Sequence, residues 1–179
     1  MSRTKLIVAL ILFLATPGVV RTVFGSEDTS YPENSPSSRS SQESTVLRQV
    51  AIALASSREA IHMLHGAPYG DDNRDRLEPS IPGMDCGIDR ILSYVTCYSP
   101  VIHTKKEAEN MFIRLNEDLK AALQSGRWKS VESVPVVGSI RNISYAEIKT
   151  GAQIDIELIA EPALDIDAYV ISLYGWTGP

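Results

Sequence analysis

The two cysteines, Cys86 and Cys97, are the residues whose chemistry has the clearest consequence for the fold. They are 11 positions apart. In one continuous helix that spacing would separate the Cα atoms by about 16 Å, far more than the roughly 4.4 to 6.8 Å that is usual for a disulfide. We predict a disulfide, with the chain turning back between the cysteines, because the N-terminal segment indicates export to an oxidising compartment. Two separate buried thiols are the alternative, and the spacing is wider than that of most zinc-binding pairs.

Histidines are the next candidates for chemistry. His62 and His65 stand three positions apart near the end of an expected helix, where they could offer two metal ligands on one face. No further histidine or cysteine lies nearby in sequence, and histidines are also favoured at a helix C-terminus by its dipole. We therefore predict no metal site. With His103 and the segment 68–85, these histidines are the basis of an alternative function, a small extracytoplasmic hydrolase or metal-dependent enzyme.

Side-chain oxygen atoms at alternate positions in Asp71–Asp75 resemble the start of a calcium-binding loop. The rest of that pattern is missing, because Arg76 stands where the loop needs glycine and Pro82 where it needs a bidentate glutamate. The segment is predicted to be a solvated acidic loop.

Two pairs of carboxylates remain, Asp155 with Glu157 and Asp165 with Asp167. The polar face of a strand explains the first pair and a turn explains the second, so we assign no catalytic residue and no cofactor. The aromatic residues Tyr174 and Trp176 have two interpretations, a binding surface or ordinary packing, and packing is the commoner use.

The N-terminus has the features of an export signal. Two basic residues precede an unbroken apolar run, residues 6–15, which a Pro-Gly pair ends. Residues 1–25 are therefore predicted to be a signal peptide. An uncleaved membrane anchor formed by residues 6–20 is the alternative, and it is shorter than the roughly 20 apolar residues that a spanning helix needs.

Residues 26–43 are rich in serine, proline and glutamate, which predicts a disordered tether. Residues 44–179 then form a single domain. Apolar residues at three- and four-residue steps predict a first amphipathic helix from about Glu43 to His65. The segment from Gly66 to Asp85 has no periodicity and is predicted to be a long loop.

The second helix has the clearest signals. Thr104 and Glu107 form a capping box, and Gly126 supplies a C-terminal stop. Between them runs one apolar stripe, made of Ala108, Met111, Phe112, Leu115, Leu119, Ala122 and Leu123.

Beyond this helix the apolar residues recur at every second position, as they do in a strand. Apolar and polar residues alternate over Ala152–Ile159, and the segments 141–149 and 167–176 are rich in β-branched and aromatic residues. Pro135 would confine an earlier strand near residues 133–140 to an edge. The expected fold class is α+β, with two amphipathic helices packed on a C-terminal antiparallel meander of three to four strands.

This order of elements, with the Gly-Arg-Trp step at residues 126–128, resembles the small exported proteins and lipoproteins of Gram-positive bacteria. The resemblance implies an α+β fold and a location in the cell envelope, and it implies no activity.

Charge narrows the possible partners. Loss of residues 1–25 removes three positive charges and no negative one, which changes the formal net charge from −5 to −8. The mature chain has no cluster of lysine and arginine, so nucleic acid is excluded as a partner, and membrane contact is expected only through an uncleaved N-terminal segment. The predicted function is a non-enzymatic binding or interaction protein, secreted or in the cell envelope, whose partner is an unknown protein or small molecule outside the cytoplasm.

The export hypothesis makes a direct prediction. We expect the mature N-terminus at Ser26 or within a few residues of it. N-terminal sequencing of protein from the envelope or the culture supernatant checks this, and a chain that still begins at Met1 or Ser2 would favour the anchor.

Overall fold

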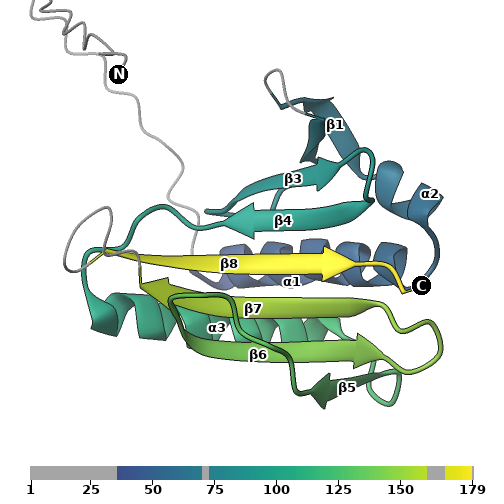
Figure 1. Cartoon of the computed structure of the whole chain (residues 1–179). Coiled ribbons are helices and arrows are strands. Elements are labelled where there is room, and N and C mark those ends of the chain that lie inside the picture. Colours follow the sequence, from purple (N-terminus) through teal and green to yellow (C-terminus); the bar gives the residue numbers. More distant parts are fainter. Residues whose placement is uncertain (1–35, 70–72, 161–167, 179) are drawn as a thin grey trace, which may run out of the picture. The chain divides into compact units, whose positions relative to one another are not determined.

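The computed structural model describes residues 36–69, 73–160 and 168–178 (Figure 1). These residues belong to one compact unit, Asn34–Pro179. The predicted signal peptide or anchor, and the tether as far as residue 35, lie outside the described residues. Within the described part, none of the helices has the length and apolar character needed to cross a membrane.

The strands among the described residues form one antiparallel sheet of eight, in the spatial order β1-β2-β3-β4-β8-β7-β6-β5. Its strands are β1 (His65–Pro68), β2 (Arg74–Leu77), β3 (Asp85–Asp89), β4 (Tyr94–Tyr98), β5 (Trp128–Val131), β6 (Ser139–Glu147), β7 (Gln153–Ala160) and β8 (Tyr169–Trp176).

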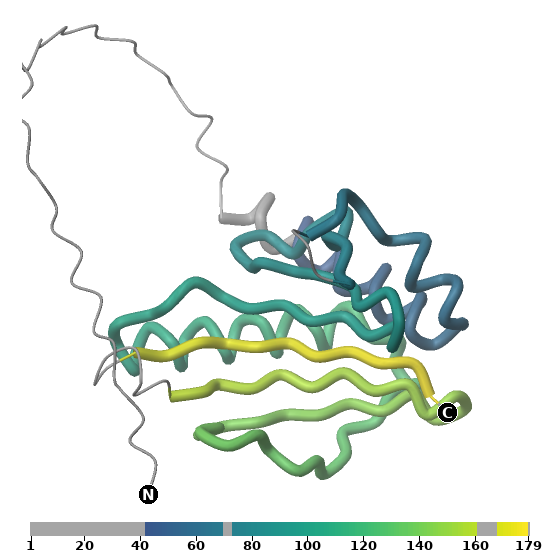
Figure 2. Tube along the Cα trace, turned by 45° about the horizontal axis from the view of Figure 1, so that its top comes forward, coloured from purple at the N-terminus to yellow at the C-terminus, as the bar shows by residue number. Residues whose placement is uncertain are grey.

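The sheet consists of two four-stranded meanders that meet in its middle. The first, β1 to β4, follows the helices α1 (Pro36–Leu54) and α2 (Arg58–His62), and the second, β5 to β8, follows α3 (Lys105–Ala122). The last strand of each meander, β4 and β8, pair with each other along five residues. The long helices α1 and α3 lie side by side on one face of the sheet (Figures 1 and 2).

The expected fold class, two helices on a meander of three to four strands, is wrong, because the described part is mostly an eight-stranded antiparallel sheet with three helices. The missed strands β1 to β3 have only four or five residues and contain glycine, proline and charged side chains. Such strands carry no alternating pattern, and hydrogen bonding to their neighbours decides their conformation. The segment predicted as a long loop therefore contains β1 and β2.

Three element boundaries also differ from expectation. Helix α1 begins at Pro36, inside the predicted tether. The first helix does not continue to His65, because it ends at Leu54 and the Ser57 side chain caps the separate helix α2. Residues 132–138, within the segment predicted as an edge strand, form a connecting loop. The strand at this edge of the sheet is β5.

The predicted N-terminus and buried face of the second helix are confirmed. Thr104 is the N-cap of α3, and its Oγ1 accepts a hydrogen bond from the Glu107 backbone N–H. The predicted stop at Gly126 is not where the helix ends: the C-cap is Leu123, with an extended backbone, and Gly126, with φ +82°, lies in the turn that follows. The apolar stripe faces the core under β7 and β8, and five of its members are buried: Ala108, Phe112, Leu115, Leu119 and Ala122.

The predicted disulfide is present. Cys86 on β3 and Cys97 on β4 lie directly opposite each other, with their Cα atoms 4.0 Å apart. The hairpin supplies the reversal of direction that the spacing required, and both side chains are buried in the core between sheet and helices. The bond closes a loop of about a dozen residues, which stabilises a fold by roughly 3 kcal/mol through the unfolded state.

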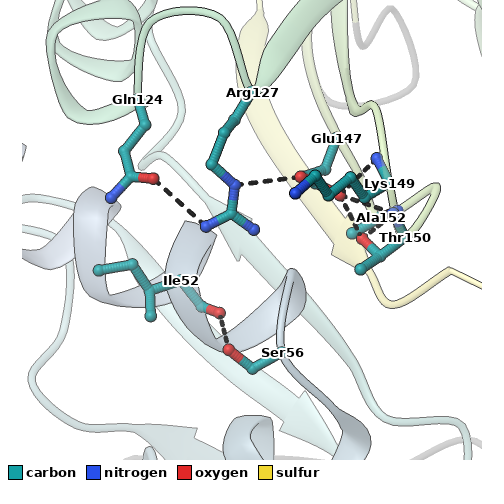
Figure 3. A network of polar contacts seen from close by, with 8 residues as sticks. All are labelled: Ile52, Ser56, Gln124, Arg127, Glu147, Lys149, Thr150 and Ala152. Carbon is teal, nitrogen blue, oxygen red and sulfur yellow. Dashed lines mark hydrogen bonds and ion pairs between the residues drawn. The ribbon is translucent and has the colours of Figure 1, made fainter.

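A buried carboxylate fastens the end of α3 to the turn between β6 and β7 (Figure 3). Glu147 accepts hydrogen bonds from the backbone N–H of Thr150 at 2.6 Å, from that of Lys149 at 2.9 Å, and from Arg127 Nε at 3.1 Å. These donors, Thr150 first, lower the pKa of Glu147 from 4.5 to about 2. The carboxylate therefore favours the folded state above about pH 4.5, and this contribution is lost as the pH falls towards about 2. Arg127 of the Gly-Arg-Trp step has a structural role here.

The helix face gives the next prediction. Leu115 is fully buried beneath the sheet, whereas its neighbour Arg114 is exposed. We expect Leu115→Ala to leave a cavity and to lower the free energy of unfolding by about 2 to 5 kcal/mol, and Arg114→Ala to change it by less than about 0.5 kcal/mol. Thermal melts of the two variants check this, and equal losses would contradict the assigned face.

Candidate functional site

The two faces of the sheet are covered differently. Side chains alternate along each strand, so Ile154, Ile156 and Leu158 of β7 point to the helices. Their neighbours Asp155 and Glu157 point to the opposite face, which no described helix covers (Figure 1). We call this second surface the open face. On β8 it carries Ser172, Tyr174 and Trp176, and on β4 it carries Tyr94, Thr96 and Tyr98.

A loop from the second meander covers part of the open face. Residues 132–138 cross over β6, where the hydroxyls of Ser133 and Ser144 hydrogen-bond and Asn142 Nδ2 donates to Ser133 Oγ at 2.9 Å. The backbone N–H of Val136 then donates to Glu157 Oε1 at 3.2 Å. The loop therefore forms a wall beside β7.

Between this wall and β4 lies an open groove of about 590 Å³. We call it the open-face groove. Two carboxylates form its base, three aromatic side chains and three aliphatic ones line the rest, and the residues are Leu92, Tyr94, Val134, Val136, Asp155, Glu157, Tyr174 and Trp176. In the described part of the chain, no lysine, arginine or histidine lines it.

Glu157 is the unusual member of the groove, because it is a carboxylate with only 2% of its surface exposed. Oε1 accepts the hydrogen bond from Val136, but Oε2 is buried and has no hydrogen-bond partner. Burial raises the pKa of Glu157 above its ordinary value of 4.5, the Val136 N–H opposes this, and the neighbouring Asp155 carboxylate adds to the increase. An unpaired buried oxygen costs about 1 to 3 kcal/mol of stability.

Asp155 and the aromatic residues surround this carboxylate. Asp155 is also buried, and its Oδ1 accepts a hydrogen bond from Gln153 Nε2 at 3.0 Å. Tyr174 stands opposite Asp155 on the next strand, and its ring meets that of Tyr98 edge to face, with centroids 6.0 Å apart. Burial, with the hydrogen bond to Tyr98 second, raises the pKa of Tyr174 to about 12, so this phenol is neutral at physiological pH.

The other half of the open face carries positive charge. Arg74 and Arg76 each lie 5.3 Å from the centre of the Tyr69 ring, and the Tyr69 hydroxyl donates to Asp85. Arg74 also donates to Thr96 across Gly87, where a Cβ would stand 2.9 Å from the guanidinium. Glycine is needed at position 87 for this crossing.

The histidines do not converge. His62 Nε2 lies 3.0 Å from the hydroxyl of Ser93, directly before β4, and His65 Nδ1 lies 3.5 Å from Asp75. His103 is exposed beyond the other end of β4. Among the described residues, no group of three or more histidine, cysteine or acidic residues could hold a metal ion. In this part of the chain the three histidines therefore do not form a common metal site.

The other acidic candidates separate as well. Asp75 is buried in β2, where it lies 3.6 Å from Arg90 Nε in addition to its contact with His65, so it is not part of a solvated loop. Asp71, Asp165 and Asp167 lie outside the described residues.

Strand alternation predicted the polar face of β7 for Asp155 and Glu157, but it did not predict that both side chains are buried there. Of the two interpretations of Tyr174 and Trp176, a binding surface or packing, the less common one applies in part, because both residues line the groove. The signal that could have found the site is the valine-rich segment 134–137, whose apolar residues lie outside every strand.

A second cavity, of about 820 Å³, lies at the N-terminus of α3. Its charged or titratable residues, His103, Lys106, Glu107 and Arg114, are all exposed to solvent. Water satisfies such groups, so this cavity lacks the desolvated polar atom that distinguishes the open-face groove.

The comparisons add no relative: the chain matches no protein-family model, no curated protein sequence and no solved structure. The function therefore has to be argued from the groove itself.

Glu157 gives a prediction with a defined sign. Because its pKa is raised in the folded protein, the folded state holds a proton more tightly than the unfolded chain does. Stability is then lost as the pH rises from about 4.5 through the folded pKa. We expect Glu157→Gln to raise the melting temperature at pH 7 and to lose this advantage below about pH 4.5. Melting curves of both proteins between pH 3 and pH 8 check this, and destabilisation at pH 7 would contradict it.

Proposed function

We propose that the protein is an exported, non-enzymatic binding protein, secreted or held in the cell envelope, which binds its partner in the open-face groove. The observation that carries the proposal is the combination of three aromatic side chains with Glu157, a buried carboxylate that has one unpartnered oxygen. Ligand sites typically combine apolar walls with a few placed polar groups in this way.

Two further observations support the proposal. The groove is bordered by exposed aliphatic side chains, with Leu92 64% and Val134 93% exposed. Exposed apolar residues beside desolvated polar groups mark interaction sites. The disulfide is weakly compatible with an extracytoplasmic location, which is where export would place the protein. A cleaved signal peptide and an anchor of residues 6–20 remain the two hypotheses for its attachment.

Fragment screening by NMR tests the proposal. The full chain, labelled with ¹⁵N and purified without reductant, is titrated with four classes of fragment: amines and guanidines, carboxylates and phosphates, neutral sugars, and uncharged aromatics. We expect one class to shift the amides of Asp155, Glu157, Tyr174 and Trp176. Trp176→Ala should weaken that binding by more than about 1 kcal/mol.

Met111→Ala is the matched control, because Met111 lines the cavity at α3 and lies away from the groove. It should leave the binding unchanged. Shifts confined to the α3 cavity, or no shift at the groove with any class, would contradict the proposed function.

A further inference from the structure

We propose that the open-face groove binds a basic side chain, arginine or lysine, from a partner peptide or protein, with the cation placed against Glu157 and Asp155 and flanked by Tyr174 and Trp176. This inference rests on the proposed function and specifies its ligand. It follows from the charge, the hydrogen bonding and the border of the groove.

The charge of the groove favours a cation. Two carboxylates line it, and no described lysine, arginine or histidine neutralises them there. On the open face, Arg74 donates a hydrogen bond to Thr96 on β4. Strand β8 separates β4 from β7, the strand that carries both carboxylates. An anion would be repelled at the base of the groove, whereas a cation would compensate the charge that burial makes costly.

The hydrogen bonding favours an N–H donor. The second oxygen of Glu157 lacks a partner, although the first accepts from Val136. Ammonium and guanidinium groups supply several N–H donors and no acceptor, which is what this oxygen requires. The aromatic rings of Tyr94, Tyr174 and Trp176 add faces that attract a cation, and guanidinium groups stack on such faces especially well.

The border of the groove favours a peptide over a free amine. Val134, in the loop that forms the wall, and Leu92, directly before β4, both line the groove and are 93% and 64% exposed. A small amine would leave this apolar surface in water. A chain that carries the basic residue could cover it on both sides, and the acidic net charge of −5 would favour the approach of such a partner.

Blocked tripeptides test this inference. Acetyl-Gly-X-Gly-amide, with X as arginine, lysine, glutamine or glutamate, is titrated into the full ¹⁵N-labelled chain, alongside butylamine and glucose. The readout is the indole N–H resonance of Trp176. We expect the arginine and lysine peptides to bind at least about tenfold more tightly than the glutamine peptide, and the glutamate peptide not to bind.

Substitutions provide the second arm. Glu157→Gln should weaken the arginine peptide at least about tenfold, because a charge-assisted hydrogen bond is lost. Its matched control is Glu117→Gln, which removes the same charge from the exposed side of α3 and should leave the affinity unchanged. Melting curves show whether each variant is folded.

The outcomes separate the two proposals. If glucose or the glutamine peptide binds the groove as tightly as the arginine peptide, the basic ligand is overturned while the binding function stands. If butylamine binds as tightly as the arginine peptide, the peptide partner is overturned. If no probe shifts Trp176, the basic ligand is overturned, and the fragment screen alone decides whether the groove binds anything.

Discussion

The pairing of β4 with β8 is the contact on which the rest of the structure depends. It joins two meanders, each preceded by a helix, into one continuous sheet, and it brings together residues more than 70 positions apart in the chain. Because α1 and α3 both pack on one face, the pairing also leaves one continuous open face across both meanders. Tyr94 from the first meander and Asp155 from the second line the same groove for this reason.

The open face shows how a sheet can bury charge without a second layer of helices. One loop, residues 132–138, is held over β6 by Ser133 and then reaches Glu157 through a backbone N–H. The loop desolvates one carboxylate oxygen, satisfies it, and leaves the other oxygen of Glu157 unpaired. A carboxylate in that state destabilises the free protein. A ligand that donates a hydrogen bond to the unpaired oxygen would supply the missing interaction. Binding sites commonly carry such a local cost.

The two meanders are secured by different covalent and ionic means. In the first, a disulfide joins adjacent short strands of five residues each, where the burial of side chains alone gives limited stability. In the second, the longer strands are closed at one turn by the Glu147 carboxylate, which also fixes the end of α3 through Arg127. The bond between Cys86 and Cys97 is at least weakly consistent with an extracytoplasmic location.

By itself the sequence determined the features that depend on local interactions. The N-cap at Thr104 and the buried stripe around Leu115 follow from contacts within four residues, and β7 follows from strict alternation. The disulfide was also predictable, because the N-terminal segment predicts export and the chain has only two cysteines, which can pair only with each other. Tertiary structure alone decided the eight-stranded sheet, because β1 to β3 are too short for a pattern and exist through hydrogen bonds to their neighbours. It also decided the groove. The strand pattern gives Glu157 only a polar face, whereas its contact with a loop some twenty residues earlier and the addition of Tyr94 from the other meander to the same groove are placements that a local pattern cannot predict.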